Sequence, residues 1–382
     1  CSGACSGARG GAVGRGRDVT DPTARLAVPA PPADAAPDDA APTTPEALEE
    51  RLSRPTGGVR AVLGRYAGDL VVLGAGGKMG LSLARMARRP LDELGGAHAT
   101  RRVIAVSRFA DPASRRPFDA AGVHTVAADL LDRRAVAALP DAPLVVYMAG
   151  LKFGTADAPQ RMWATNTVAP ALVAERYAGA RVVAFSSGNV YPRTPAPGRG
   201  AAEDAPLTPL GEYANACVAR ERVLEWACER ARTPLAIVRL SYAVDLRYGV
   251  LVDIAEKVRN REPVDVRTGW VQVIWQGDAN AYALQAFARA DVPAVALNVT
   301  GPDAWSVAEL ARRFGLRFRR DPLLVGITAP DALLSDTTLQ QRLFGPPTVP
   351  TARLVDWVGA WLQAGGATLG RPTKFEVRDG RY

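Results

Sequence analysis

A glycine-rich stretch directly follows the first strongly apolar run of the sequence. The run LVVLG leads into GAGGKMG, in which Gly74, Gly77 and Gly80 recur every third residue. Between a strand and a helix, the first glycine allows a tight turn and the second lets the backbone approach a pyrophosphate. The third lets the helix pack on the strand, while its N-terminal amides face the phosphates. The stretch therefore predicts a dinucleotide site; the alternative is a glycine-rich turn in an α/β protein that binds another ligand.

The end of the second apolar run bears on the choice of coenzyme. An Asp or Glu at this place would bind the ribose diol of the adenosine half and select NAD. The run ends in VIAVSRF, so this chain has Ser107 and Arg108 there. A guanidinium beside a small hydroxyl suits a 2′-phosphate. The sequence therefore favours NADP over NAD; the plain alternative is a solvent-facing Arg in an Arg-rich chain.

Short β-type runs alternate with helical patterns from about residue 69 onward. The runs read as strands are LVVLG (70–74), RVIAV (102–106), HTVAA (124–128), LVVYMAG (144–150), VVAFS (182–186) and LAIVRL (235–240). Continuous apolar strands joined by helices indicate a parallel sheet covered on both faces, with right-handed crossovers. We therefore predict an α/β fold: a doubly wound parallel Rossmann sheet with a smaller C-terminal substrate lobe.

Composition divides the chain into four predicted parts. Residues 1–64 are a Gly/Ala/Pro-rich leader with little to bury, predicted to be disordered apart from a short helix near PEALEERL. Residues 65–240 form the dinucleotide-binding domain. Residues 241–370 form the substrate-binding lobe, interleaved with the first domain, and include the strand-like VQVIW and VALNV. Residues 371–382 are a tail.

Composition also limits the partners. The net charge is +8, and all but four of the 47 basic residues are Arg. No basic stripe with aromatics is present, so we expect no nucleic-acid partner; the mild surplus suits an anionic small ligand. No apolar run approaches the roughly 18 residues of a membrane helix. Four scattered cysteines without CxxC, and two histidines, argue against a metal site and fit a reducing, cytoplasmic compartment.

Several stretches between Leu70 and about Leu362 occur in the order found in one known family. They are GAGGKMG, ADLLD, YMAGLK, the TN of MWATNTVAP, FSSGNVYP, YANAC, QGDANAYALQAF and LNVTGP. Together they resemble the extended short-chain dehydrogenase/reductase family, the NAD(P)-dependent epimerase/dehydratase group. AGLK is close to UDP-galactose 4-epimerases. The resemblance implies the fold predicted above, and none of these stretches fixes the substrate.

The resemblance also implies which residues bind the coenzyme. Asp129 of ADLLD is expected beside the adenine, YMAGLK lines the dinucleotide, and Asn166 recurs on the following helix. With the glycine turn and the second strand end, the expected set is Gly74, Gly77, Lys78, Met79, Gly80, Ser107, Arg108, Asp129, Leu130, Ala149, Gly150, Lys152 and Asn166.

Two further residues match the family's reacting groups. The family moves a hydride between a sugar-like carbinol and nicotinamide; Ser187 matches the serine that bonds the reacting oxygen, and Tyr213 matches the base. A tyrosine, with a pKa of about 10, is a weak base at neutral pH unless cations stabilise its phenolate. In the family these are the oxidised nicotinamide and a lysine four residues further along the same helical face.

Cys217 stands where that lysine belongs. A neutral thiol supplies no positive charge, and a thiolate would raise the pKa of the tyrosine. Three explanations stay open. Lys152 or Arg220 can substitute as the cation; the protein can bind a dinucleotide without turnover; or the scaffold can support different chemistry, including a Cys217 nucleophile. The structural alternative for Cys217 is a small buried residue.

Other departures from the family concern the substrate. Gly188 and Asn189 stand where sugar-nucleotide 4,6-dehydratases carry an Asp-Glu pair, which argues against elimination of water. Tyr242 stands where UDP-sugar epimerases have an Asn that contacts the diphosphate. Arg239 and Arg247 are left as candidates to meet an anion, so a nucleotide-sugar substrate does not follow from the sequence.

These observations predict a cytoplasmic, NAD(P)-dependent epimerase or oxidoreductase that acts on a sugar, nucleotide sugar or related polyol. Its partner is a small-molecule substrate, with neither nucleic acid nor membrane, and analogy with the family suggests a homodimer. The alternative is a catalytically impaired dinucleotide-binding sensor or subunit on the same fold.

Overall fold

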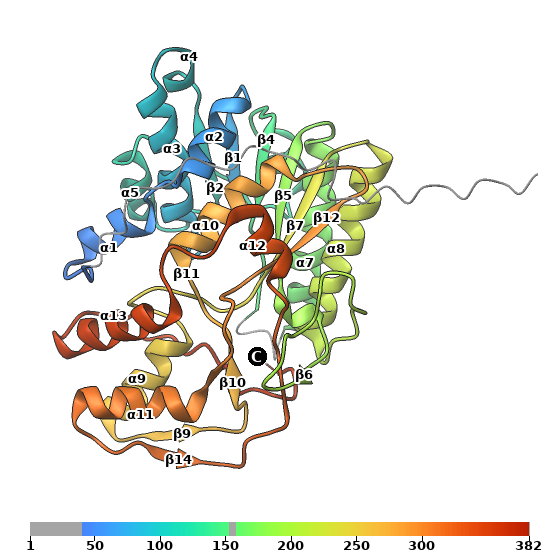
Figure 1. Cartoon of the computed structure of the whole chain (residues 1–382). Helices are drawn as coiled ribbons and strands as arrows, with labels where there is room; N and C mark the ends of the chain where they lie inside the picture. The colour runs from blue at the N-terminus through green and yellow to red at the C-terminus, as the bar shows by residue number, and fades with distance from the viewer. Residues whose placement is uncertain (1–39, 153–157, 382) are drawn as a thin grey trace, which may run out of the picture. The chain divides into compact units, whose positions relative to one another are not determined.

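The centre of the protein is a seven-stranded sheet. Its strands are β1 (Leu70–Leu73), β2 (Val103–Ser107), β3 (His124–Ala127), β4 (Leu144–Tyr147), β5 (Arg181–Ser187), β7 (Leu235–Leu240) and β12 (Val295–Val299). The computed structural model describes residues 40–152 and 158–381. The strand order is β12-β7-β5-β4-β1-β2-β3, and every neighbouring pair is parallel (Figure 1). The predicted α/β fold with a doubly wound parallel sheet is confirmed.

Helices cover both faces of this sheet because its strands are apolar on both sides. On β1, Leu70 and Val72 belong to one buried cluster, and Val71 and Leu73 belong to another. The first cluster contains side chains of α2 (Gly57–Arg65), α3 (Gly80–Leu94) and α10 (Gln276–Gln285). The second contains side chains of α6 (Arg133–Ala137), α7 (Pro159–Arg176) and α8 (Glu212–Arg230). Short helices α4 (Gly96–Ala99) and α5 (Arg116–Asp119) complete this region.

Part of the predicted leader is ordered. Residues before 40 lie outside the described residues, but α1 (Pro45–Leu52) and α2 form two capped helices, with Thr44 and Thr56 accepting hydrogen bonds at their N-termini. Val59 and Leu63 are fully buried. The short helix expected near PEALEERL is α1, and the expectation of disorder is wrong for α2. The average composition of residues 1–64 does not reveal their few spaced apolar side chains. The helices that carry these side chains become stable when they pack on α3 and α10.

The C-terminal lobe has its own buried core. The helices α9 (Val250–Asn260), α11 (Val307–Phe318) and α13 (Thr351–Gln363) lie together in Figure 1 and share one apolar cluster. The strands VQVIW and VALNV were both expected in this lobe. For VALNV this is wrong: it is β12, which pairs with β7 at the edge of the central sheet, where Leu297 and Val299 are buried. The chain thus passes from lobe to sheet and back.

Short strand pairs connect the remaining segments. They are β6 (Thr194–Pro195) with β15 (Asp331–Ala332), β8 (Ala243–Val244) with β11 (Ile274–Trp275), β9 (Pro263–Asp265) with β14 (Leu323–Val325), and β10 (Trp270–Val271) with β13 (Trp305–Ser306). One further helix, α12 (Thr338–Phe344), contacts β12. Among the described residues, no helix is both long and apolar enough to cross a membrane.

Candidate active site

The glycine turn has the geometry that the sequence predicted. Gly74 has φ +88°, and a Cβ on it would lie 2.6 Å from the backbone nitrogen of Ala149. A Cβ on Gly80 would overlap the carbonyl of Ala75, so this glycine lets α3 approach β1 closely. By contrast, a Cβ on Gly77 would lie 3.5 Å from its nearest neighbour, so the space beside Gly77 is open. The turn therefore fits a phosphate group placed against bare backbone.

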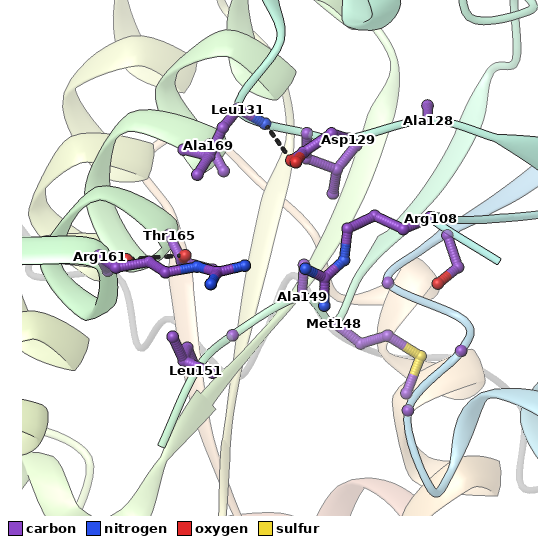
Figure 2. A pocket seen from close by; sticks show the side chains of 16 residues that line it. Arg108, Ala128, Asp129, Leu131, Met148, Ala149, Leu151, Arg161, Thr165 and Ala169 are labelled. Carbon is purple, nitrogen blue, oxygen red and sulfur yellow. Dashed lines mark hydrogen bonds between the residues drawn. The ribbon is translucent and has the colours of Figure 1, made fainter. Parts of the chain in front are cut away.

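A first cavity, of about 300 Å³, opens beside this turn (Figure 2). We call it the adenosine cavity. Eight of the predicted coenzyme residues line it: Gly74, Gly77, Ser107, Arg108, Asp129, Leu130, Ala149 and Gly150. They come from the carboxyl ends of β1, β2, β3 and β4, where ligands of open α/β sheets bind. The residues present fit the adenosine half of a dinucleotide.

Two guanidinium groups point toward each other across the adenosine cavity (Figure 2). One is the predicted Arg108, and the other is Arg161 on α7, which the sequence analysis missed. Arg161 and Thr165 lie one helical turn apart on the side of α7 that lines the cavity, and Thr165 Oγ1 donates to the Arg161 carbonyl at 2.8 Å. The spacing of these two residues, next to the TN motif, was an available signal.

Asp129 also lines the adenosine cavity, but one of its oxygens is already used. Its Oδ1 accepts a hydrogen bond from the backbone nitrogen of Leu131 at 3.0 Å. This is an Asx turn, which fixes the carboxylate at the end of β3.

A second cavity, of about 240 Å³, lies between the sheet and the C-terminal lobe. We call it the reaction cavity. Predicted residues in its wall are Lys78, Met79, Lys152, Ser187 and Tyr213. The remaining wall residues are Ser186, Asn189, Leu240, Ser241, Tyr242, Ala243, Tyr248, Gly249, Val250, Leu333 and Thr373. The structure thus brings the predicted tyrosine and serine together with two lysines.

Lys78 was expected to bind the coenzyme. Its side chain also extends from the glycine turn to the substrate lobe. Its Nζ donates to the Ala243 carbonyl at 2.9 Å and lies 4.3 Å from the ring centre of Tyr248. Burial lowers the pKa of Lys78 to about 8, and the nearby Asp245 opposes that change. This side chain therefore joins the turn to the substrate lobe across the reaction cavity.

Tyr213 stands in the first turn of α8 with three functional groups around its phenol. The phenol is hydrogen-bonded to both Ser187 and Cys217. The Nζ of Lys152 lies 5.5 Å from the centre of the Tyr213 ring. Ser187, Tyr213 and Lys152 therefore lie together in the wall of the reaction cavity.

The groups around Tyr213 shift the pKa of its phenol in opposite directions. Burial raises the pKa of Tyr213 far above its ordinary value, the neighbouring Cys217 raises it further, and Arg220 lowers it. Burial lowers the pKa of Lys152 to about 8; Cys217 opposes that change, and Lys374 adds to it. Arg220 therefore carries a permanent positive charge near the phenol, whereas Lys152 carries one only below a pH of about 8.

Arg220 acts from behind the cavity wall. Its Nη1 donates to the Phe185 carbonyl at 2.8 Å, and its Nη2 donates to Oδ1 of Asn166. The amide of Asn166 donates to the Leu151 carbonyl at 3.1 Å. A Cβ on Gly150 would lie 2.6 Å from Arg220 Nη2. Asn166, predicted to bind the coenzyme, thus lines neither cavity; it holds the segment after β4 against Arg220.

Cys217 is fully buried and lines neither cavity. It packs with Val190, Tyr191 and Ala201. Burial raises the pKa of the Cys217 thiol, and Arg220 opposes that change. A neutral, enclosed thiol is a poor nucleophile. This geometry therefore favours the interpretation of Cys217 as a small buried residue.

The two arginines considered as anion-binding groups are already paired. Arg239 is buried, bonds Glu221 at 2.8 Å and donates to the Tyr191 hydroxyl at 2.7 Å. Arg247 pairs with Asp245 at 2.9 Å and with Glu49 at 2.7 Å. Neither lines the reaction cavity. Among residues 40–152 and 158–381, no group of three or more His, Cys, Asp or Glu side chains could hold a metal ion.

Comparison with known proteins agrees with this arrangement. Residues 70–246 match the family described as NAD dependent epimerase/dehydratase. No curated protein sequence matches the chain significantly. Among solved structures, a UDP-galactose 4-epimerase is 25% identical, with a TM-score of 0.61, over 78% of this chain and 99% of that chain.

Two further solved structures share the fold at lower identity. UDP-glucuronic acid 4-epimerase from Bacillus cereus, in complex with NAD, is 14% identical over 77% of this chain and 98% of that chain, with a TM-score of 0.64. The Bordetella bronchiseptica enzyme WbmG, in complex with NAD and UDP, is 16% identical over 81% of this chain and 99% of that chain, also with a TM-score of 0.64. At these identities, the likeness is one of fold.

Proposed function

We propose, from the membership of residues 70–246 in the NAD dependent epimerase/dehydratase family, that the protein is a nicotinamide-dependent epimerase of a nucleotide sugar. The observation that carries the proposal is the hydrogen-bonded pair Ser187 and Tyr213 in the reaction cavity. The adenosine cavity lies on the other side of the glycine turn. Proteins of the same fold are named as UDP-sugar epimerases, and some are in complex with NAD, which supports NAD(H) as the coenzyme.

In this proposal the side chains of the reaction cavity handle the proton. A bound nicotinamide would supply the acceptor and donor of the hydride. Tyr213 takes the proton of the sugar hydroxyl as the carbonyl forms, and Ser187 donates a hydrogen bond to the same oxygen. Tyr213 returns the proton once the hydride has been delivered to the opposite face. The net result is inversion at one carbon with no change of oxidation state.

Two cations together replace the missing lysine. Arg220 supplies a permanent charge behind the phenol, and Lys152 lies beside the ring with a pKa of about 8. The form with a Tyr213 phenolate and a protonated Lys152 contains as many protons as the form with a neutral phenol and a neutral amine. Starting from a neutral phenol and a protonated amine, Tyr213 and Lys152 together therefore reach the reactive form, a phenolate beside a protonated amine, by losing one proton in total.

A second candidate, a dinucleotide-binding sensor without turnover, is favoured by one observation. Tyr213 is hydrogen-bonded to Cys217, and this contact raises the pKa of the phenol where the family's lysine would lower it. In that case the glycine turn would still bind the coenzyme while proton transfer fails.

The variant Cys217→Lys, with Cys217→Ala as its matched control, separates the two candidates. Calorimetry with NAD and NADP measures coenzyme binding, and product analysis with UDP-glucose measures epimerisation. We expect the native protein to turn over, and Cys217→Ala to keep that activity. If the native protein binds coenzyme without turnover, and activity appears only in Cys217→Lys, the enzyme proposal is wrong and the protein is a sensor.

The finer points of the proposal are the coenzyme, the assembly and the compartment. The NAD-bound structural neighbours support NAD(H), whereas Arg108 and Arg161 in the adenosine cavity would also suit the 2′-phosphate of NADP; paired titrations with the two coenzymes decide between them. A homodimer and a cytoplasmic location remain proposals from family analogy and cysteine usage. Equilibrium sedimentation tests the first of these two.

A further inference from the structure

Lys78 places a positive charge in the wall of the reaction cavity. It follows Gly77 in the glycine turn, but it lines the reaction cavity and not the adenosine cavity. Two contacts with the substrate lobe locate its ammonium group: Nζ donates to the Ala243 carbonyl at 2.9 Å and lies 4.3 Å from the ring centre of Tyr248. Ala243 and Tyr248 line the same cavity. The ammonium group therefore lies between two residues that form the cavity wall.

The ammonium group of Lys78 has more donors than the described residues use. A protonated lysine carries three N–H donors and no acceptor. Within residues 40–152 and 158–381, the Ala243 carbonyl is its one hydrogen-bond acceptor, and no carboxylate lies within ion-pair distance. Asp245, whose charge favours the protonated form of Lys78, is itself paired with Arg247 at 2.9 Å. Lys78 is thus a cation that no carboxylate contacts directly.

The other groups of the cavity wall also favour an anion. No Asp or Glu is among the described residues that line the cavity, whereas a second lysine, Lys152, is. Gly249 and Val250, at the start of α9, line it too, and no side chain of the described residues caps this helix. The positive end of the α9 dipole therefore adds to the effect of the two lysines. The cavity has a positive potential without a carboxylate of its own in the wall.

The residue type at position 78 is uncommon in this chain. Only four of the 47 basic residues are lysines, and two of these four line the reaction cavity. A lysine offers a compact point charge, where an arginine offers a planar fork. Burial lowers the pKa of Lys78 to about 8, so the amine is mostly protonated at neutral pH. Because a buried charge without a partner is unfavourable, a bound anion would stabilise this ammonium group.

We propose that the Lys78 ammonium group binds an anionic group of the substrate in the reaction cavity, so that Lys78 selects substrates that carry a phosphoryl or carboxylate group. The inference rests on the proposed function and specifies which side chain recognises the substrate. The backbone of Lys78 belongs to the turn proposed to bind the coenzyme, and its side chain belongs to the substrate site. A diphosphate attached to the sugar and a carboxylate on the sugar share this chemistry.

Calorimetry on the NAD-loaded full chain tests this assignment. The ligands are UDP-glucose, UDP-glucuronic acid and inorganic pyrophosphate. The variants are Lys78→Met, which keeps the length of the side chain, Lys78→Arg, which keeps the charge, and the control Arg312→Met, which removes an exposed charge from α11. Lys78→Met should weaken the anionic ligand about 10- to 100-fold, as loss of a charged hydrogen bond does. Lys78→Arg should retain more of this affinity, and the control should bind as the native protein does.

A second variant, Tyr248→Leu, tests the position of the ammonium group without a change in the glycine turn. Loss of the ring removes the cation–π contact and should weaken the same ligand about two- to fivefold. Titration of each variant with NAD, before loading, shows whether the turn is intact. We expect the affinity for NAD to equal that of the native protein in all of them.

The matched ligands distinguish the two sources of the anion. If Lys78 binds a diphosphate, Lys78→Met should weaken all three ligands. If it binds a sugar carboxylate, only UDP-glucuronic acid should lose affinity. Unchanged affinity for all three ligands would overturn the inference. An equal loss of affinity for NAD would also overturn it, because the ammonium group would then belong to the coenzyme site.

Failure of the inference and failure of the proposed function give different results. Binding of these ligands through Lys78 without turnover would leave the inference standing and contradict the enzyme. Turnover of UDP-glucose, with the same affinity in Lys78→Met as in the native protein, would do the reverse. A native protein that binds none of the three ligands would contradict both.

Discussion

The adenosine cavity and the reaction cavity are built in different ways. The adenosine cavity is lined by one stretch of chain, residues 74–169, at the ends of consecutive strands. The reaction cavity collects side chains from the glycine turn, the ends of β5 and β7, α8, the lobe and the C-terminal segment. The departures from the family pattern, such as Tyr242 and Cys217, lie in or directly behind this second cavity. The residues proposed to bind the adenosine half thus come from one stretch of the chain, whereas the residues proposed for the chemistry come from distant segments.

The variant Tyr213→Phe should distinguish the roles of the two cavities most clearly. Loss of the phenolic hydroxyl should lower turnover by about 10²- to 10⁴-fold, the usual contribution of a positioned base. Coenzyme affinity, measured by calorimetry, should not change, because Tyr213 does not line the adenosine cavity. A fully active Phe variant would remove Tyr213 from the mechanism.

Lys152→Met tests the electrostatics of the reaction cavity. Turnover at pH 7 should fall by about 10- to 100-fold, as expected for loss of a charged partner. The pH profile carries more information. Native activity should rise with pH and level off near 8, where the pair of Lys152 and Tyr213 loses its first proton. Without Lys152 the rise should continue beyond about pH 10, since the phenol must then ionise alone, with a pKa well above that of free tyrosine. A variant that levels off at the same pH as the native protein would contradict this role.

Gly74→Ala affects the other cavity. The left-handed backbone costs an L-residue about 1–2 kcal/mol, and overlap with Ala149 adds about 1–3 kcal/mol. We expect lower thermal stability and at least about a tenfold loss of coenzyme affinity. Gly365→Ala is the matched control, because its φ is +78° and its Cβ would meet nothing within 4 Å. Equal effects of both variants on coenzyme binding would show that the close approach of the turn to β4 is unimportant.

The smallest effect is expected at the rim of the adenosine cavity. Arg108→Leu and Arg161→Leu should each weaken NADP by about 1 kcal/mol, roughly fivefold, and leave NAD unchanged. Paired titrations with the two coenzymes measure this, with the exposed Arg134→Leu as control. Losses that are the same for both coenzymes would assign the arginines to the shared diphosphate.

The comparison also explains what was predictable. Six of the seven strands in the central sheet and the glycine turn followed from apolar runs and glycine spacing, because those signals are local. The seventh strand, β12, was assigned to the wrong part of the molecule, since a five-residue apolar run does not specify its pairing partner. Helix α1 was expected from the stretch PEALEERL, whereas α2 was missed because its stability comes from packing on α3 and α10.

The candidate site divides along the same line. The sequence by itself determined the fold, the dinucleotide turn, the residue types at positions 187 and 213, and the absence of a lysine at 217. Only the tertiary structure decided where the cations are: it placed Lys152 beside the Tyr213 ring and Arg220 behind the wall of the reaction cavity. Electrostatic interactions depend on distance in space and on burial, and neither quantity is encoded in spacing along the chain.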